Sequence, residues 1–333
     1  MAPNDDKITV AVTGPTGTFG FGLIPLLQAD ERIERIVGVA RRPFDARAHG
    51  WSKMDYRRGD VRDQAGLEEA FAGADAVVHL AFLIAGNAPR ETIREINVEG
   101  TLNAFRAAAG AGVKRFVYAS SVAAYGFHRD NPVGMTESWP VRPAAHLFYA
   151  QEKAELEQLL RDEVASTSVG LYLLRPPVVL GPHAVGAKEF MPERMARLTG
   201  TVLDALRRAP VGAPVPVPDL PVQFIHEDDV GQALHLCVLA AGPPGEYNIT
   251  GDGVLSARDV ARELGVLPLP LPARLVQVAA RALASVPFAP PVAEWAEAIS
   301  HPAIMDAGKA KRELGWEPRY DSLAALRATF SAP

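Results

Sequence analysis

Cysteine, basic runs and clustered metal ligands are all scarce in this sequence. Its 333 residues include one cysteine, Cys237, so an internal disulfide is excluded. None of the eight histidines stands with the cysteine at the spacing of a metal site. No basic run stands out and the formal net charge is −5, which disfavours a surface that follows nucleic-acid phosphates. We therefore expect a cytoplasmic protein with no metal and no nucleic-acid partner.

Long apolar runs are scarce as well. The N-terminus, Met1 to Lys7, is polar and acidic, unlike a signal peptide. The most apolar later stretch, Val266 to Pro291, contains Arg274, Arg281 and many prolines, so it cannot span a bilayer. We expect no membrane partner, although such a stretch could line an apolar pocket.

What remains is an ordinary globular composition, with 48% hydrophobic and 22% charged residues. Nearly continuous apolar runs predict buried strands at Ile8–Val12, Ile33–Val39, Ala76–Leu80, Phe116–Ala119 and Val169–Leu174. Helical patterns lie between them, at Phe19–Ala29, Gln64–Phe71, Arg90–Ala109 and Phe148–Glu163. Alternating strands and helices predict an α/β fold with a Rossmann-type doubly wound parallel sheet.

A glycine-rich turn, Thr13-Gly14-Pro15-Thr16-Gly17-Thr18-Phe19-Gly20, follows the first predicted strand and opens the first predicted helix. Glycine allows a tight turn and lets the backbone approach a pyrophosphate, which the N–H groups of the helix N-terminus then bind. The glycine spacing differs from that of the commonest dinucleotide fingerprint, and a plain tight connection is the alternative. At this place in an α/β chain the turn favours nucleotide binding.

The second predicted strand ends in Val39-Ala40-Arg41-Arg42-Pro43, without the carboxylate that would bind the ribose 2′-hydroxyl of NAD. Arg41 and Arg42 stand there instead, and their guanidinium groups suit a 2′-phosphate. The alternative is a pair of solvated arginines on a loop. We expect NADP(H) as the favoured cofactor, with NAD(H) as the alternative.

Tyr149 and Lys153 lie four residues apart in a predicted helix, so both side chains share one face. A phenol of pKa about 10 is a poor proton donor or acceptor at neutral pH. A neighbouring ammonium favours the phenolate, so we expect Lys153 to lower the pKa of Tyr149 toward neutrality. Taken alone, such a pair is also common on helix surfaces.

The regular alternation of strands and helices ends after Gly181, where proline-rich connections dominate. We expect residues 1–180 to form a dinucleotide-binding Rossmann domain that carries the catalytic residues. Residues 181–333 would be mainly a smaller substrate-binding portion, with some segments returning to the Rossmann domain. Phe224 to Val230 reads as a strand end followed by an acidic helix start.

Together these parts resemble the extended short-chain dehydrogenase/reductase superfamily, in its NAD-dependent epimerase/dehydratase branch. The resemblance spans nearly the whole chain, from Lys7 to Ser331. Besides the glycine turn and Tyr149 to Lys153, its pieces are Gly59-Asp60-Val61, Val78-His79-Leu80-Ala81, Asn97-Val98-Glu99-Gly100-Thr101, Ser120-Ser121-Val122-Ala123-Ala124-Tyr125-Gly126, Arg175-Pro176, Phe224 to Val230, Tyr247-Asn248 and Lys311-Arg312-Glu313-Leu314-Gly315-Trp316. Their order and spacing make the resemblance specific.

The resemblance implies roles for the matching positions. Tyr149 would be the acid/base, Ser121 would hydrogen-bond the reacting oxygen, and Lys153 would tune the tyrosine and hold the nicotinamide ribose. Cofactor contacts would come from Gly14, Thr16, Gly17, Thr18, Phe19, Gly20, Arg41, Arg42, Asp60, Val61, Leu80, Ala81, Phe82, Asn97, Ala119, Tyr149, Lys153, Pro176 and Val178. Substrate contacts would come from Leu83, Ser121, Ala123 and Tyr149. Ser120, His79 and His226 are read as structural residues rather than catalysts.

Three departures from the family pattern bear on the substrate. Val178 stands where nucleotide-sugar members usually have Asn, and Val222 where they commonly have Arg. Losing these donors weakens diphosphate binding by about 1.5–3 kcal/mol for each charge-assisted hydrogen bond. Val122 and Ala123 follow Ser121, where 4,6-dehydratase members have acidic residues. The departures disfavour a nucleotide sugar and a dehydration.

The sequence as a whole predicts an NADP(H)-dependent oxidoreductase acting on a carbonyl or secondary alcohol of a mostly apolar small molecule. A sugar epimerase with retained cofactor, a non-catalytic NADP(H)-binding regulator and one step of a larger assembly stay open. Phe82, Leu83 and Ile84 would wall the pocket. Arg274 to Ser285 could be a lid helix, with a packed structural helix or a membrane-surface helix as the alternatives, and its two arginines are too few for firm membrane attraction. The helices at Arg90–Ala109 and Phe148–Glu163 correspond to those that pair subunits in relatives, which implies a homodimer.

Overall fold

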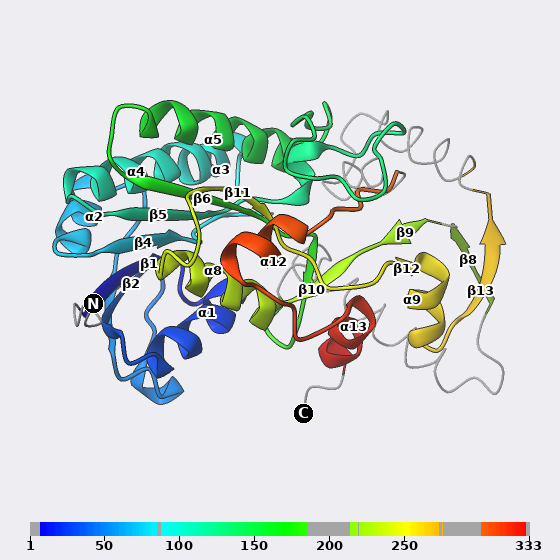
Figure 1. Ribbon diagram of the computed structural model, residues 1–333, viewed down its shortest axis with the longest axis horizontal. Coiled ribbons are helices and arrows are strands. Elements are labelled where there is room, and N and C mark those ends of the chain that lie inside the picture. The colour runs from blue at the N-terminus through cyan, green and yellow to red at the C-terminus, as the bar shows by residue number, and fades with distance from the viewer. Residues whose placement is uncertain are drawn as a thin grey trace.

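In the computed structural model the chain is built around one parallel sheet (Figure 1). The structure describes residues 7–84, 88–184, 214–218, 220–272, 275 and 301–330. Seven parallel strands run in the order β11-β6-β5-β4-β1-β2-β3. They are β1 (Ile8–Thr13), β2 (Ile33–Ala40), β3 (Met54–Arg58), β4 (Ala76–His79), β5 (Arg115–Ala119), β6 (Gly170–Arg175) and β11 (Gly245–Asn248). The predicted Rossmann-type α/β fold is confirmed.

Helices cover both faces of the sheet (Figure 1). One face carries α1 (Thr18–Ala29) and α8 (Glu227–Val238), and the other carries α2 (Gln64–Phe71), α4 (Gly100–Gly110) and α5 (Phe148–Val164). Each face has its own apolar core: Leu23, Ile24 and Leu234 belong to the first, and Leu67, Phe105 and Leu156 to the second. Because both faces are covered, the central strands consist of apolar residues almost throughout.

Helices α1 and α8 approach each other through two glycines. A Cβ added at Gly22 would lie 2.2 Å from the carbonyl oxygen of Glu227, and one added at Gly231 would lie 2.2 Å from that of Gly22. Such distances exclude any side chain at either position. The contact fixes the start of α8 against the helix that begins in the glycine-rich turn.

The predicted strands and helices of the first 180 residues are all present, with ends that agree to within one residue. The predicted helix at 90–109 is divided into α3 (Arg90–Arg94), a π-helical stretch at Glu95–Glu99 and α4. Two strands of the large sheet, β3 and β11, were not predicted. Both are short edge strands that contain charged residues, so neither shows the apolar run of a buried strand.

Beyond Gly181 the predicted strand end and acidic helix start are confirmed as β10 (Phe224–His226) and α8. β10 pairs with β7 (Val178–Leu180), β9 (Pro221–Val222) with β12 (Leu255–Ser256), and β8 (Pro214–Pro218) with β13 (Leu267–Leu271). The remaining elements are the short 3-10 turns η1 (Arg47–His49) and η3 (Val122–Tyr125) and the helices α9 (Ala257–Glu263), α12 (Gly308–Leu314) and α13 (Ser322–Phe330). β11 and α8 return to the large sheet, as expected, while a domain division at 180/181 stays a prediction. The expected lid helix lies outside the described residues except for Leu275.

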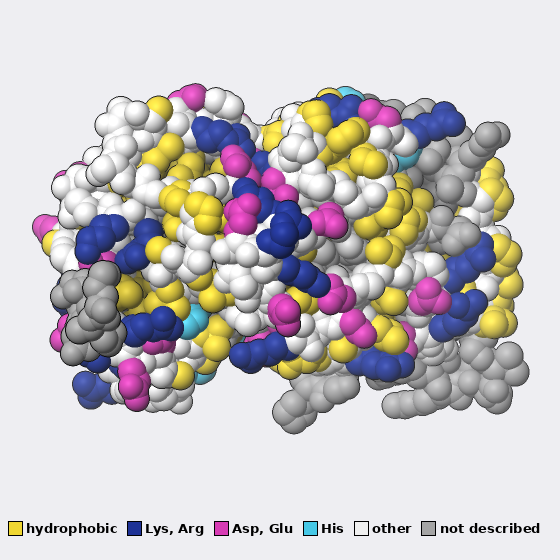
Figure 2. Space-filling view, in the orientation of Figure 1, with side chains coloured by type: hydrophobic (Ala, Val, Ile, Leu, Met, Phe, Trp, Pro, Cys, Tyr) yellow, Lys and Arg dark blue, Asp and Glu magenta, His cyan; other side chains and the backbone are white. Residues whose placement is uncertain are grey.

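Charged side chains of both signs are interspersed over the face of the molecule seen in Figure 2. Within the described part of the chain, no helix is long and apolar enough to cross a membrane. Across those same residues, no three His, Cys, Asp or Glu side chains are grouped so that they could hold a metal ion.

Candidate active site

The site forms where neighbouring parallel strands end. β1, β4 and β5 are adjacent in the sheet, and each is followed at its carboxyl end by a predicted site segment. These segments are the glycine turn, Leu80 to Leu83 and the Ser120-Ser121 pair. The carboxyl edge of such a sheet is where doubly wound proteins bind ligands.

The glycine turn has the backbone geometry that its sequence predicts. Gly14 adopts φ +68°, and a Cβ there would lie 2.9 Å from the backbone nitrogen of Ala81. Gly20 packs against the carbonyl of Pro15, 2.0 Å from where a Cβ would stand. Gly17 begins α1 and supplies no capping side chain. This uncapped helix start, with its closely packed glycines, fits the pyrophosphate of a dinucleotide.

At the far end of the cofactor region, Arg41 and Arg42 are exposed directly after β2. The Arg58 guanidinium donates to the carbonyl of Arg41 (3.0 Å), which holds the backbone of this pair rather than its side chains. Asp60 is bound by Arg62 through two hydrogen bonds of 3.1 and 2.8 Å. These bonds, more than the nearby Arg41, lower the pKa of Asp60. The guanidinium groups of Arg41 and Arg42 therefore remain available for an anion.

Ser121 and Tyr149, the predicted catalytic hydroxyls, meet in the structure. Ser121 starts the 3-10 turn η3 and accepts a hydrogen bond from the Ala123 N–H (3.1 Å). Tyr149, in the first turn of α5, is joined to Ser121 by a side-chain hydrogen bond. Burial raises the pKa of Tyr149 to about 12, and the bond to Ser121 opposes this rise. Tyr149 is therefore a neutral phenol at pH 7.

Lys153 lies one turn further along α5, and its ammonium binds two groups of β5. Its ammonium donates to the Ala119 carbonyl (2.7 Å) and the Tyr118 hydroxyl (3.1 Å). It stands 3.5 Å from the ring centroid of Phe82 and 5.9 Å from that of Tyr149. Burial lowers the pKa of Lys153 to about 7.

The expectation that Lys153 lowers the pKa of Tyr149 is therefore wrong for this structure. Spacing on a helix places the two residues on one face, but it does not show where the ammonium ends or how much water the phenol loses. Here removal of water from the phenol outweighs every nearby charge. At neutral pH the proton therefore stays on Tyr149, which is a weaker acid here than a phenol in water.

Asn97 is central to the site, although it touches no reacting group. Its side chain accepts from the Leu83 N–H (2.8 Å) and donates to the Leu83 carbonyl (3.0 Å) and to Glu152 (2.7 Å). It lies in the π-helical stretch, a local irregularity that is frequent at functional sites. Asn97 thus ties the loop after β4 to helix α5.

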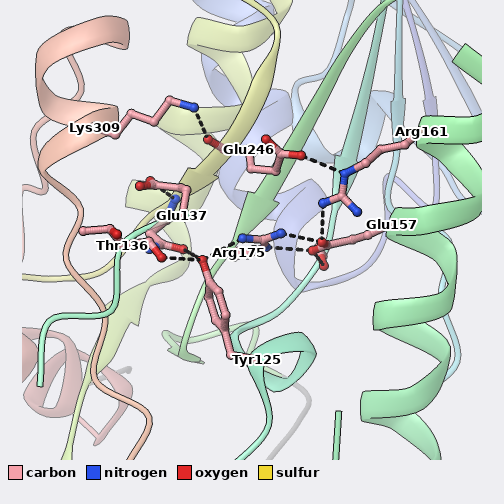
Figure 3. Close-up of polar contacts among 10 residues, drawn as sticks. Tyr125, Thr136, Glu137, Glu157, Arg161, Arg175, Glu246 and Lys309 are labelled. Carbon is pink, nitrogen blue, oxygen red and sulfur yellow. Dashed lines mark hydrogen bonds and ion pairs between the residues drawn. The ribbon is translucent and has the colours of Figure 1, made fainter. Parts of the chain in front are cut away.

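A buried network behind the hydroxyl pair was not predicted (Figure 3). Arg175 donates to both carboxylate oxygens of Glu157 (2.8 and 2.5 Å) and to the Tyr125 hydroxyl (2.6 Å). Ser120, the neighbour of Ser121, donates to Glu157 (2.6 Å). Although burial lowers the pKa of Arg175, its hydrogen bonds to Glu157 raise it overall. The network anchors the segment that carries Ser121.

One sequence signal could have revealed this network. Tyr149, Lys153, Glu157 and Arg161 follow each other at intervals of four along α5 and therefore share one face. Arg161 donates to Glu157 (3.0 Å) and to Glu246 of β11 (2.8 Å), as Figure 3 shows. One face of the helix thus carries both the candidate chemistry and an ion-pair chain across the sheet edge.

The histidines read as structural have contacts of that kind. His79 is buried between the hydroxyls of Thr13 (2.9 Å) and Thr101 (3.0 Å). Burial lowers its pKa to about 3, so it is uncharged. His226 accepts from the N–H of Asp228 (3.2 Å) at the start of α8 and stacks on Tyr320.

The other predicted contact residues lie around the same strand ends. Pro176 accepts from the Val122 N–H (2.9 Å), and Ala123 packs with Leu147 beside Tyr149. Val178 pairs with Phe224 and is 58% exposed. Thr18 reaches away from the strands, since its hydroxyl donates to the carbonyl of His183 (2.9 Å).

This sheet, its glycine turn and the Ser121, Tyr149 and Lys153 group define a Rossmann-type protein of the extended short-chain dehydrogenase/reductase class. A family model for the NAD dependent epimerase/dehydratase family matches residues 10–250, and the chain belongs to that family.

Three known proteins illustrate the similarity. Sterol demethylase protein B of Methylococcus capsulatus is 30% identical over 253 residues, 74% of this chain and 70% of the relative. UDP-glucose 4-epimerase of Streptomyces lividans is 28% identical over 287 residues, 81% of this chain and 80% of the relative. The solved UDP-glucose 4-epimerase of Thermus thermophilus, a complex with NAD, has a TM-score of 0.69 at 23% identity, with 97% of each chain covered. The last likeness concerns the fold alone.

Proposed function

We propose that this protein transfers a hydride between a nicotinamide dinucleotide and a carbonyl or secondary alcohol of a small molecule. The observation that carries the proposal is the hydrogen-bonded hydroxyl pair of Ser121 and Tyr149. It lies at the sheet edge that also carries the glycine turn, with the buried amine of Lys153 one helical turn away. A cytoplasmic location stays part of this proposal.

The residues of the chain have separate tasks in the proposed reduction. The cofactor, when bound, supplies the hydride that the carbonyl carbon gains. Ser121 and Tyr149 bind the carbonyl oxygen, and Tyr149 gives it a proton as negative charge develops there. The phenolate left on Tyr149 regains a proton from solvent. Oxidation of an alcohol runs through the same residues in reverse.

We propose NADP(H) as the favoured cofactor. Arg41 and Arg42 are exposed at the end of β2, where a 2′-phosphate would lie, and no carboxylate stands between them and the strand. Asp60, whose pKa the charge of Arg41 helps to lower, already pairs with Arg62. The Thermus epimerase is a complex with NAD, so NAD(H) is the alternative.

We propose a mostly apolar substrate. Ile84 and Val178, which lie after β4 and at the start of β7, are 39% and 58% exposed in the described part of the chain. Val222 lies two residues before Phe224, the β10 residue that pairs with Val178. Exposed apolar groups near a site favour an apolar ligand. A relative named sterol demethylase protein B points the same way.

The second candidate is an epimerase that oxidises and re-reduces a sugar. It is favoured by the Streptomyces relative, a UDP-glucose 4-epimerase that matches 81% of this chain. The two functions differ in cofactor balance. An epimerase retains its cofactor and shows no net change in the nicotinamide, whereas a reductase consumes NADPH in proportion to product.

A screen of ketones and alcohols, followed at the NADPH absorbance band, tests the proposal. We expect stoichiometric NADPH consumption with an apolar ketone and no turnover of UDP-sugars. Conversion of a UDP-sugar to its epimer without net NADPH consumption would support the second candidate instead.

A further inference from the structure

Glu152 is a buried carboxyl that the proposed reaction does not use. Its side chain is 1% exposed. One carboxylate oxygen accepts from the Asn97 amide (2.7 Å), while the other, Oε1, is buried with no hydrogen-bond partner. Leaving a buried polar atom unpaired is costly, so such a group needs a compensating role. Its chain neighbour is Lys153, the buried amine of the site.

The other carboxylate near Lys153 is already neutralised. Glu157 is fully buried and binds Arg175 through both oxygens, with a further bond from Arg161. Its negative charge is therefore shared between two guanidinium groups. The field that it exerts on Lys153 is correspondingly weakened.

Of the described residues, the other groups packed around Lys153 carry no charge. Tyr118, from β5, is a buried phenol whose pKa burial raises well above its usual value. His79, from β4, is neutral because burial lowers its pKa to about 3. Phe82, after β4, presents only the face of its ring. Tyr149 is a neutral phenol.

Glu152 itself has no cation bonded to it. The nearest guanidinium that lowers its pKa belongs to Arg94 of α3, and that group is hydrogen-bonded to Glu155 at the surface (2.7 and 2.5 Å). Among the described residues around Lys153, Glu152 is thus the carboxylate that no bonded cation neutralises.

We propose that Glu152 is a positioning residue whose buried charge keeps the amine of Lys153 cationic and whose bond to Asn97 fixes helix α5 against the Leu83 loop. The inference rests on the proposed function for its meaning in catalysis, but the charge state of Lys153 can be measured without any reaction. The direction of the pKa shift agrees with this proposal. Burial lowers the pKa of Lys153 to about 7, and the charge of Glu152 opposes this shift more than that of Glu157 does. Burial in turn raises the pKa of Glu152.

Carbon-13 NMR of the protein labelled with [6-13C]lysine tests the proposal. The Cε resonance of Lys153, identified by its loss in Lys153→Met, should titrate with a midpoint near pH 7 in the wild-type protein. Glu152→Gln keeps the shape of the side chain and removes its charge. We expect this variant to move the midpoint to lower pH by about one pH unit, because an opposite charge nearby favours the charged amine. An unchanged midpoint would overturn the proposal.

Two further variants separate the charge from the fold. Glu152→Asp retains a carboxylate and should leave the midpoint closer to the wild-type value than Glu152→Gln does. Glu155→Gln is the matched control, since it removes a negative charge from the same helix at a surface position. We expect no displacement of the Lys153 midpoint in this control. An equal displacement in both glutamine variants would show a general charge effect and contradict the specific role.

A measurement without substitution covers the case in which Glu152→Gln does not fold. In wild-type protein labelled with [5-13C]glutamate, every glutamate carboxyl carbon should be at its ionised position where Lys153 titrates. A carboxyl that stays protonated up to pH 8 would refute a charged Glu152. If the proposed hydride transfer also holds, Glu152→Gln moves the alkaline loss of kcat to lower pH. A displaced Lys153 midpoint with no carbonyl turnover would leave this inference standing and reject the proposed function.

Discussion

At the residue scale, Tyr149 shows the difference between placing a catalytic group and tuning it. Spacing in the sequence singled out Tyr149 and Lys153, the family resemblance added Ser121, and the structure brings Ser121 and Tyr149 into hydrogen bonding. Spacing said nothing of solvent, and burial raises the pKa of the tyrosine to about 12. The phenol is therefore protonated at neutral pH, as the proposed reduction requires, but its raised pKa makes it a weaker acid than a phenol in water.

Tyr149→Phe removes the proposed proton donor and retains the ring. We expect kcat for ketone reduction to fall by about 10²–10⁴-fold, the usual contribution of general acid catalysis, with little change in thermal stability. Tyr320→Phe is a matched control, since it also removes a phenol hydroxyl and retains the ring, which in Tyr320 stacks on His226. Full activity in Tyr149→Phe would rule out the proton transfer.

Glu157→Gln tests the buried network at the same scale. Removing one partner leaves Arg175 charged and buried, and we expect a loss of about 3–5 kcal/mol in the free energy of unfolding, measured with urea. Glu163→Gln, on the same helix, breaks a surface pair with Arg106 and should cost no more than about 1 kcal/mol. Equal losses in the two variants would contradict the role given to the network.

At the scale of elements, strands and helices with a clear pattern of apolar residues could be predicted from the sequence. Elements without such a pattern could not. β1 and β4 consist mostly of apolar residues because both faces of these strands are largely buried. β3 reads Met-Asp-Tyr-Arg-Arg, since an edge strand can hold charges. The sequence pattern of residues 90–109 is that of one continuous helix, so it did not reveal the π-helical stretch at Glu95–Glu99. Edges and irregularities depend on tertiary neighbours that a local pattern does not contain.

Gly22→Ala tests the close contact between α1 and α8. A Cβ at position 22 would lie 2.2 Å from the backbone carbonyl oxygen of Glu227, which is held in helix α8. By analogy with overpacked cores, we expect the free energy of unfolding to fall by at least about 1–3 kcal/mol. Gly110→Ala, at the end of α4, meets nothing within 4 Å and should be neutral or stabilising. Urea unfolding of both variants makes the comparison, and an unaffected Gly22→Ala would refute the tight packing.

At the scale of the whole molecule, the fold class followed from the alternation of strands and helices, while the details of ligand recognition did not. β10, beyond Gly181, pairs with β7, which precedes it, and β11 completes the large sheet from far along the chain. Such pairings join segments distant in sequence, so composition alone cannot order them.

Cofactor binding should stabilise the whole molecule. A ligand at 100 times its Kd adds about 2.7 kcal/mol to the free energy of unfolding. We expect NADPH to raise the Tm more than NADH does at equal concentration. In an Arg41→Ser, Arg42→Ser double variant, the Tm increases with NADPH and with NADH should become similar. A larger rise with NADH in the wild-type protein would overturn the arginine assignment.

We propose a homodimer formed through α4 and α5, which lie side by side on one face of the sheet (Figure 1). Light scattering should then give a mass of about twice the 35.6 kDa of one chain. A mass of one chain at micromolar concentration would contradict the proposal.

The regular interval of four along α5 couples chemistry to architecture. Tyr149 and Lys153 belong to the proposed reaction, and Glu157 and Arg161 hold β6 and β11 in place. Inserting a single residue between Lys153 and Glu157 would rotate everything beyond it by about 100°. Substitutions in this helix should therefore be tolerated more readily than insertions or deletions. A one-residue insertion would disrupt both the proposed reaction and the ion pairs that hold the sheet edge.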